Sequence, residues 1–467
     1  MSKILPTAGL LGSLSVRDAS RVELDGVELA LTGDWRLLAY GDSLDGLAGE
    51  RSSRDGRPVL VGPADHANLE WLRTRLPWLH PRLLGTACSA GFGDRLGFAT
   101  AGHVRALRSA GHGISPIFAQ QSIREMARSG RTPQQVLDDA TWGVFAEGWR
   151  DGFGADADHV KSEADVDACA AAGYTFYTID PGEFVWNEAD TVSPDEVRAA
   201  VATLPWPDLE DSAPEMLARY AHGKAQTETA AMKAAAKYGR AIVHVVRLHR
   251  RIHERRGDRF ELEVSVDETA SPTTPEQHLY IAGELHRLGV EFVSFAPRFP
   301  GRFEKGIDFI GDLEEFERVY AGHAEIARSL GPYKLSLHSG SDKFSVYSAA
   351  AKLSGRMVHL KTAGTSWLEA LRTVGEVDRE LLAEIYRCAL ERYPVDRASY
   401  HVSAEVATAP LAVDLDDNAS RQIMHVTFGS ILAEFGGRIL PLLADHRDRY
   451  EAAVQRHFER HLRPFQA

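Results

Sequence analysis

Short apolar segments that end in polar residues recur through the middle of the chain, and most of them precede a stretch with helical periodicity. Eight of these segments predict β-strands, which begin near residues 95, 115, 154, 174, 259, 291, 333 and 357. Thr274 is a candidate N-cap for a helix that ends at Gly289, and a second helix ends in the same way at Gly331. Strands that alternate with helices are typical of a parallel sheet.

Eight strand–helix units are enough to close a (β/α)8 barrel of the TIM type, which needs about 250 residues. We therefore predict an α/β protein in which residues 91–375 form a TIM-type barrel with a helical insertion at 183–257, after the fourth strand. Residues 1–90 do not fit the repeat and are predicted to form an N-terminal cap. Residues 376–467 are predicted to be a mostly helical C-terminal extension packed on the barrel. A doubly wound open sheet is the alternative, but no GxGxxG motif follows the first predicted strand.

The predicted barrel has polar side chains on its inward face. Successive side chains of a strand alternate between its two faces, so the residues between the helix-facing apolar positions point inward. In the fifth strand the inward residues are Glu261, Glu263, Ser265 and Asp267. In the last two strands they are Ser336, His338, His359 and Lys361. Active sites of TIM barrels lie at the C-terminal ends of the strands, where several of these residues fall.

Each of these residues also has a structural explanation. A histidine at a strand end is more often a hydrogen-bonded structural residue than a ligand. An ion pair of Glu263 with Lys334 or Lys361 would neutralise the buried carboxylate without any catalysis. The acidic segment 154–161 fits a surface loop equally well. The functional interpretation is favoured because carboxylates, histidines and lysines all converge at predicted strand ends.

Histidine and carboxylate side chains without cysteine suit a catalytic metal site that keeps open positions for substrate. The candidate ligands are His159, His338 and His359, and zinc is the expected metal, with manganese, cobalt or nickel as alternatives. No HExxH motif is present. His401 and Glu405 form an alternative pair of ligands, although their surroundings look like a strand rather than the helix that this spacing suits.

Composition narrows the classes of partner. The formal net charge is −13 and the pI is about 5.8, which argues against nucleic acid and against an anionic membrane surface. The three cysteines, Cys88, Cys169 and Cys388, are widely spaced and form no CxxC pair, so they suggest neither a disulfide framework nor a thiolate zinc site. No signal peptide and no run of about 18 apolar residues is predicted, and the expected compartment is the cytoplasm. The sequence does not specify an oligomeric state.

A small-molecule acid fits this charge pattern better, as the binding partner, than nucleic acid or an anionic membrane does. Basic residues lie near the predicted strand ends at Lys161, Arg298, Lys305 and Lys361, and they predict a local site for a carboxylate or phosphate. Arg302 is nearby, but ordinary surface charge explains it better. Gln120 and Gln121 end the second predicted strand and provide neutral groups suited to sugar hydroxyls.

Five long motifs together resemble the tagaturonate/fructuronate epimerase family, and they occur in the same order as in that family. They are FAQQSIREMARSGRTPQQVLDDATWGVF, GFGADADHVK, FEKGIDFIGD, LSLHSGSDKFSVY and VHLKTAGTSWLEALR, and the similarity runs from about residue 95 to about residue 430. The resemblance implies a metal-dependent isomerase that interconverts D-tagaturonate and D-fructuronate in hexuronate catabolism. It also implies site roles for Asp158, His159, Glu263 and His338, with Glu268 as the alternative to Glu263.

The two uronates named by this resemblance differ at a carbon beta to the ketone, whose C–H the ketone does not acidify. Inversion there needs either retro-aldol cleavage and re-addition or oxidation and re-reduction by a tightly held nicotinamide. No dinucleotide motif is visible, so the retro-aldol route is favoured, with Asp158 and Glu263 as acid and base. The alternatives are a metal-dependent aldolase or sugar isomerase and a non-catalytic sugar-acid-binding protein. Release of free three-carbon products would identify the aldolase.

Overall fold

The computed structural model describes residues 15–221, 227–362 and 364–466. Residues 1–14, within the N-terminal segment where no signal peptide is predicted, and residues 222–226 of the predicted insertion lie outside the described residues.

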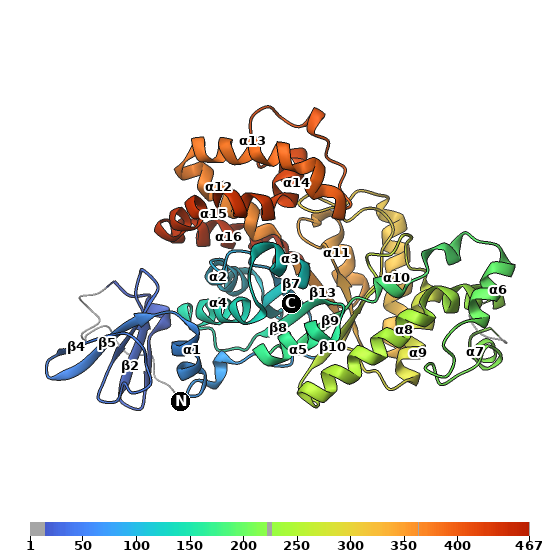
Figure 1. The fold of residues 1–467 in the computed structure, drawn as a ribbon, viewed down its shortest axis with the longest axis horizontal. Coiled ribbons are helices and arrows are strands. Elements are labelled where there is room, and N and C mark those ends of the chain that lie inside the picture. Colours follow the sequence, from blue (N-terminus) through green and yellow to red (C-terminus); the bar gives the residue numbers. More distant parts are fainter. Residues whose placement is uncertain (1–14, 222–226, 363, 467) are drawn as a thin grey trace.

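The N-terminal cap is an antiparallel sheet with the strand order β1-β2-β3-β5-β4. Its strands are β1 (Val22–Leu24), β2 (Val27–Leu31), β3 (Arg36–Tyr40), β4 (Glu50–Arg54) and β5 (Arg57–Pro63). Leu29, Leu37 and Leu60 are fully buried, so the sheet contributes its own apolar layer to the core. Helix α1 (His66–Arg73) follows the sheet and packs against the barrel helix α4 (Pro133–Ala146). Figure 1 shows this sheet at one end of the molecule, beside the barrel.

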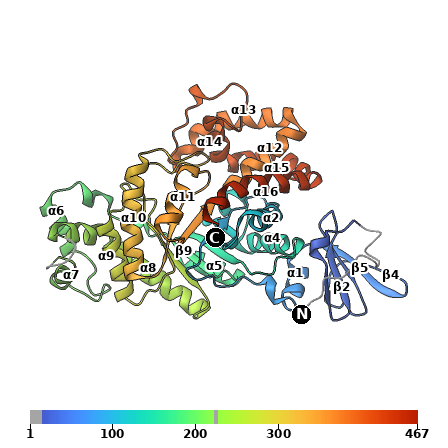
Figure 2. The ribbon, with the colours of Figure 1, turned by 180° about the vertical axis from the view of Figure 1, so that it is seen from behind.

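Eight parallel strands close into a barrel, which confirms the predicted fold class and excludes the open sheet. The strands are β6 (Ser89–Phe92), β7 (Ser115–Ser122), β8 (Gly154–Val160), β9 (Phe176–Ile179), β10 (Glu261–Ser265), β11 (Ser294–Ala296), β12 (Lys334–Leu337) and β13 (Val358–Thr362). They pair in chain order, and β13 pairs with β6 to complete the ring. The two opposite views of Figures 1 and 2 show helices around this central sheet.

The first strand of the barrel lies earlier than predicted. The segment from residue 95 was expected to be a strand, but β6 occupies 89–92 and residues 100–110 form helix α2. The Asp94 carboxylate accepts hydrogen bonds from the backbone N–H groups of Leu96, Gly97 and Ala99, and this turn ends the extended chain. The apolar run that follows is a buried helix, and a short apolar run alone does not distinguish a buried helix from a strand.

Helices follow every strand of the barrel. They are α2 (Thr100–Ala110), α3 (Ile123–Ser129), α4, α5 (Glu163–Ala172), α6 (Pro194–Ala202), α7 (Ala213–Tyr220), α8 (Glu228–Arg256), α9 (Pro275–Arg287), α10 (Leu313–Leu330), α11 (Phe344–Leu353) and α12 (Thr365–Val377). The helical insertion after the fourth strand contains α6, α7 and α8. The long helix α8 packs against both α5 and α9, so it also fills the fourth place in the ring of barrel helices.

Short 3-10 helices join several of these elements. They are η2 (Asp18–Ser20), η3 (Pro77–Leu79), η4 (Gly182–Phe184), η5 (Asn187–Asp190), η6 (Arg397–Ser399), η7 (Val406–Thr408) and η8 (Arg463–Phe465).

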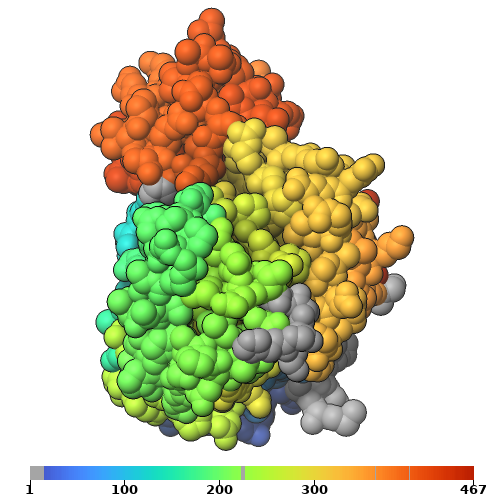
Figure 3. All heavy atoms as spheres, turned by 90° about the vertical axis from the view of Figure 1, so that its right-hand side faces the viewer, coloured from blue at the N-terminus to red at the C-terminus, as the bar shows by residue number. Residues whose placement is uncertain are grey.

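The C-terminal extension is helical. It consists of α13 (Arg379–Asp396), α14 (Asn418–Val426), α15 (Phe428–Asp445) and α16 (Arg447–Leu462), and α16 packs against the barrel helices α2 and α12. Figure 3 shows part of this extension, in orange, as a lobe on top of the barrel. No single helix in the described ranges is long and apolar enough to cross a membrane, whereas α14 and α15 pass that test together, by length and composition only, with a bend of 78° between them.

A buried carboxylate ties the N-terminal region and the C-terminal extension to the barrel. Glu451 on α16 is fully buried, and its Oε2 lies 2.6 Å from Nη2 of Arg17 and 3.0 Å from Nη2 of Arg105. Arg447, one turn earlier on the same helix, lies 3.4 Å from the other carboxylate oxygen. Three separate parts of the chain therefore meet at one buried negative charge.

We expect Glu451→Gln to lower the free energy of unfolding by about 3–5 kcal/mol, because Arg447 then loses its carboxylate partner and Arg17 and Arg105 keep only their other pairs, mainly with Glu147. Urea denaturation followed by circular dichroism measures this loss. Asp195→Asn, which removes only an exposed pair with Arg198, is the control and should cost less than about 1 kcal/mol. Equal losses in the two variants would contradict the anchoring role of Glu451.

Candidate active site

A lysine lies at the centre of the polar barrel interior. The Nζ of Lys361, near the end of β13, is 2.8 Å from a carboxylate oxygen of Asp156, 2.8 Å from one of Asp158 and 2.9 Å from one of Glu263. It also donates a hydrogen bond of 2.5 Å to the Thr178 hydroxyl. All five side chains are buried, and they come from strands β8, β9, β10 and β13. The ion pair of Glu263 with Lys361 that the sequence allowed is therefore present.

This arrangement determines which groups are charged. Burial opposes ionisation of Glu263 and Asp158, but the Lys361 ammonium holds the pKa of each carboxyl well below its usual range. Burial also opposes charge on Lys361, and the three carboxylates nevertheless raise its pKa well above the usual value. Burial raises the pKa of Asp156 to about 7, although Lys361 acts in the opposite direction. At neutral pH the centre of the site therefore holds ionised Asp158, Glu263 and Lys361.

An irregularity in β8 brings two consecutive residues to the site. Regular alternation would point Asp158 inward and His159 outward. The register of β8 against β9 shifts between Ala157 and Val160, and His159 has a φ of 56°. Such a left-handed conformation is uncommon for a residue with a side chain and is typical of functional sites. Both Asp158 and His159 consequently line the same cavity.

His159 and His338 face one another with carboxylates around them. Their ring centroids are 5.1 Å apart. The Nδ1 of His159 lies 3.2 Å from Asp180, and the Nε2 of His338 lies 2.7 Å from Glu263. The Nδ1 of His338 lies 3.2 Å from Asp267. Candidate ligand atoms of His159, His338 and Asp267 all lie within 4.8 Å of one another.

This group of three fits a divalent metal. Two imidazoles and one carboxylate form a donor set typical of zinc and related ions. Each histidine also has one ring nitrogen beside a further carboxylate, Asp180 or Glu263, and such partners orient metal-ligating histidines. Although burial disfavours protonation, nearby carboxylates raise the pKa of His159 to about 10 and that of His338 to about 9. The local field therefore favours additional positive charge, which a metal ion would supply.

The structure does not bring His359, the third predicted ligand, to this group. His359 precedes Lys361 by two residues on β13 and lies deeper in the barrel, where it is fully buried. Its Nδ1 lies 2.9 Å from the Ser89 hydroxyl, its ring packs 5.5 Å from that of Phe176, and burial lowers its pKa to about 3. Asp267 occupies the third place instead. Its inward position at the end of the fifth strand was the sequence signal for it.

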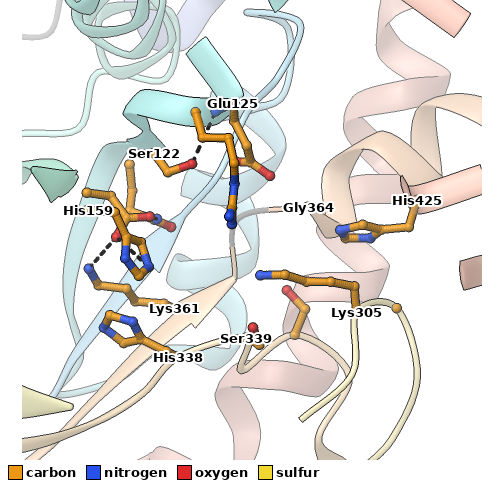
Figure 4. Close-up of a pocket in the computed structure, with 14 residues that line it drawn as sticks. Ser122, Glu125, His159, Lys305, His338, Ser339, Lys361, Gly364 and His425 are labelled. Atoms are coloured by element: carbon orange, nitrogen blue, oxygen red, sulfur yellow. Dashed lines mark hydrogen bonds and ion pairs between the residues drawn. The ribbon is translucent and has the colours of Figure 1, made fainter. Parts of the chain in front are cut away.

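Above this group is a cavity, closed on one side by Lys361, His159 and His338 and on the other by Lys305 and His425 (Figure 4). The cavity shares Lys305 and His338 with a wider opening, which Arg298, Phe299, Phe303 and Tyr400 also line.

Two cations at this opening lack partners. In the described part of the chain, neither the Lys305 amine nor the Arg298 guanidinium makes a hydrogen bond or ion pair. Figure 4 shows the Lys305 amine pointing into the cavity. Burial lowers the pKa of both groups. An anion entering this opening would therefore find two cations that no protein carboxylate has neutralised.

The other predicted polar residues are Gln120, Gln121 and Lys161, and of these three Gln120 alone lines the cavity. Gln120 lines the cavity, donates a 2.8 Å hydrogen bond to Asp158, and has a buried Oε1 without a hydrogen-bond partner. Gln121 points away and bonds to Ser129 and Arg131. Lys161 pairs with Asp180 at 3.0 Å beside the site.

The remaining alternatives lie nearer the surface. Glu268, the alternative to Glu263, is exposed and pairs with Arg124 at 3.2 Å, and its carboxylate also lies within 4.8 Å of candidate ligand atoms of His159 and Asp180. His401 lines only the wider opening, whereas Glu405 pairs with Arg397, so this alternative pair is not brought together.

The sequence prediction missed several cavity-lining residues, among them Glu125 and His425. Glu125 on α3 is buried, its Oε1 accepts a hydrogen bond from Arg95, and its Oε2 has no hydrogen-bond partner. In the sequence it looks only like a residue in the first turn of a capped helix, since its backbone N–H bonds to Ser122. His425 comes from α14, far beyond the barrel, and carries no local signal.

Comparison with known proteins decides the family. A family model described as tagaturonate epimerase matches residues 41–465. The chain belongs to the tagaturonate epimerase family. It is thus a carbohydrate epimerase, and epimerases are isomerases. The match extends beyond residues 95–430 in both directions, so it includes β4 and β5 of the N-terminal sheet and the whole of α14 to α16.

Individual members of the tagaturonate epimerase family agree with this assignment. The chain is 42% identical over 472 residues to the tagaturonate/fructuronate epimerase of Thermotoga maritima, with 96% of each chain covered. Crystal structures of the fructuronate-tagaturonate epimerase of Cohnella laeviribosi, native and with glycerol, match with a TM-score of 0.90, 35% identity and 97% of each chain covered. The barrel, the cap and the extension are therefore all shared with a solved epimerase.

We expect Lys361→Met to destabilise the metal-free protein more at pH 8 than at pH 5. Without the ammonium, Asp156, Asp158 and Glu263 are buried like charges, so their folded-state pKa values rise above the unfolded values. The variant therefore loses stability as the pH rises through these raised folded-state pKa values. In the wild type the pKa values of Asp158 and Glu263 are depressed, so their ionisation stabilises the folded protein at pH 8. Thermal unfolding with chelator at both pH values measures the difference.

Lys161→Met is the control for this prediction, because the Lys161 side chain is 40% exposed and its amine pairs with one carboxylate, Asp180. It should show a small loss that changes little with pH. A loss in Lys361→Met that is the same at both pH values would show that the three carboxylates do not depend on Lys361 for their ionisation.

Proposed function

We propose that this protein is a metal-dependent epimerase that interconverts D-tagaturonate and D-fructuronate by retro-aldol cleavage and re-addition. The single observation that supports this most is the cavity itself. Its lining has the two histidines of the donor set on one side and the unpaired Lys305 on the other, together with an ionised Asp158, and the Asp267 carboxylate lies close to both histidines. The 42% identity to an epimerase named for these two uronates supports them as the substrates.

The metal is assigned to His159, His338 and Asp267, with Asp180 and Glu263 holding the two imidazoles in place. Zinc suits these donors best, and manganese, cobalt and nickel suit them as well. When bound, the ion would act as a Lewis acid towards the ketone and neighbouring hydroxyl oxygens of the substrate.

Asp158 is assigned the proton transfer. It lines the cavity, and Gln120 and Lys361 each fix one of its oxygens. Asp158 takes the proton of the hydroxyl on the carbon beta to the ketone. That C–O becomes an aldehyde carbonyl, the bond between the alpha and beta carbons breaks, and its electron pair becomes the enediolate of the ketone half. Rotation of the aldehyde and the reverse steps give the epimer and return the proton.

Glu263 is assigned a positioning role in place of direct acid–base work. It is fully buried, its oxygens are engaged by His338, Lys361, Thr178 and Ser294, and it lines neither part of the cavity. Glu125 is the better candidate for proton transfer at the second face of the aldehyde, because its Oε2 is free of hydrogen bonds and the residue lines the cavity.

The test of this function is incubation with D-tagaturonate, with and without a chelator, with the products resolved by chromatography. We expect D-fructuronate to form, the activity to be lost with chelator, and zinc, manganese, cobalt or nickel to restore it. Free three-carbon products in place of the epimer would identify an aldolase. Uronate binding without turnover, even with metal restored, would identify a binding protein.

The ligand assignment predicts a specific pattern of metal content. Asp267→Asn and His338→Ala should each lower metal affinity by at least tenfold, and His359→Asn should leave it near that of the wild type, because His359 lies away from the donor group. Metal content after dialysis, measured by mass spectrometry, checks this. Loss of metal in His359→Asn but not in Asp267→Asn would reassign the site to the three histidines.

Lys305 and Arg298 are assigned to the substrate carboxylate. Lys361, which the sequence grouped with them, is already engaged by three carboxylates and is not assigned to substrate. A charge-assisted hydrogen bond contributes roughly 1.5–3 kcal/mol. Lys305→Met or Arg298→Met should therefore lower kcat/KM for D-tagaturonate by about 10–150-fold and change that for the neutral ketose D-tagatose far less.

Arg302→Met is the matched control, since Arg302 is an exposed cation at the same opening that already pairs with Glu304. Its ratio of kcat/KM for the two substrates should stay at the wild-type value. Equal losses on both substrates in Lys305→Met and Arg298→Met would remove the carboxylate assignment.

A further inference from the structure

The backbone around Lys305 is held by side chains from outside its own loop. This stretch, residues 304–307 and here called the Lys305 segment, follows β11 and has no helix or strand of its own. A side chain on such a loop is ordinarily mobile, because few backbone groups of a loop are bonded. The carbonyl oxygens of Glu304, Gly306 and Ile307 are nevertheless all bonded, and each accepts from a cationic side chain.

Lys343 binds two of these carbonyls. It is fully buried just before α11, and its Nζ lies 2.8 Å from Glu304 O, 2.5 Å from Ile307 O and 2.8 Å from Ser341 O. Three carbonyl acceptors match the three N–H donors of an ammonium group, and no carboxylate in the described residues pairs with it. Burial of this kind is costly, and it lowers the pKa of Lys343 to about 7.

The C-terminal extension binds the rest of the segment. Arg421 on α14 donates from Nε to Gly306 O at 2.6 Å and from Nη2 to Asp342 at 2.9 Å. Gln422 on the same helix donates to the Glu304 carboxylate at 2.8 Å, and Ser403 donates to it through its backbone N–H and its hydroxyl. Figure 3 shows the extension, in orange, meeting the yellow part of the chain to which this segment belongs.

From these contacts we infer that Lys343 is a positioning residue that selects substrates with a carboxylate, acting through Lys305. Lys343 fixes both ends of the Lys305 segment, and Arg421 fixes its middle, so that the Lys305 amine is held in the cavity before substrate arrives. Pre-organisation of this kind raises affinity because the ordering cost is met in folding. This inference rests on the proposed function, since it takes the substrate to be a uronate.

The test is a double-mutant cycle on one quantity, the ratio of kcat/KM for D-tagaturonate to kcat/KM for D-tagatose. We expect Lys343→Met to lower this ratio about tenfold, mainly through a higher KM for the uronate. In the Lys305→Met background, Lys343→Met should change the ratio by less than about twofold, because the group through which it acts is gone. A further tenfold fall in the double variant would overturn the inference.

Arg73→Met is the control for general destabilisation, because Arg73 is another buried cation, bonded to Asp138 and Thr141 on α4. It should lower the melting temperature and leave the ratio unchanged. A ratio that falls equally in Arg73→Met and Lys343→Met would show that the effect is one of stability and would also overturn the inference.

Turnover by the wild type tests the proposed function separately from the inference about Lys343. If the wild type with metal turns over neither substrate, the same cycle is run on calorimetric binding of D-tagaturonate and D-tagatose. The inference is supported without catalysis if the wild type binds the uronate more tightly than the ketose. Lys343→Met should then reduce this preference, and Lys305→Met should abolish it. Equal binding of the two sugars by the wild type overturns it.

Discussion

The structure of the site depends on one buried ammonium group. Lys361 holds Asp156, Asp158 and Glu263 together in the barrel interior, where TIM barrels are usually filled by branched apolar side chains. Three buried carboxylates without a cation would repel one another and take up protons. With Lys361 present, Asp158 stays ionised in the cavity and Glu263 stays ionised beside His338. The metal binding and the proton transfer that we propose would both require these charges.

The two walls of the cavity are built in different ways. The wall with Lys361, His159 and His338 lies at the C-terminal ends of barrel strands, and a local irregularity in β8 turns His159 towards it. The wall with Lys305 and His425 depends on α14 and on Lys343, which hold a loop that has no regular structure. The C-terminal extension is therefore part of the site and not only a covering of the barrel. The family match through residue 465 is consistent with this.

Much of the barrel was predictable, since seven of the eight strands coincide with predicted segments and polar residues mark their ends. The first strand was misplaced because an apolar helix and a buried strand look alike over a few residues. Face alternation also placed Glu263, His338 and Lys361 inside correctly. It could not rank them by depth, which is why His359 was grouped with His338 although it lies a layer below, against Ser89 and Phe176.

The sequence by itself determined the alternation of strands and helices, the polar inward face of the strands and the family, because these depend on local periodicity and on motifs read in order. Tertiary structure alone decided that Asp267 joins His159 and His338, that Lys361 is engaged by three carboxylates, and that Lys305 has no partner. Each of these depends on distances between residues far apart in the chain. Such distances follow from barrel closure and from the docking of α14, which no local pattern encodes.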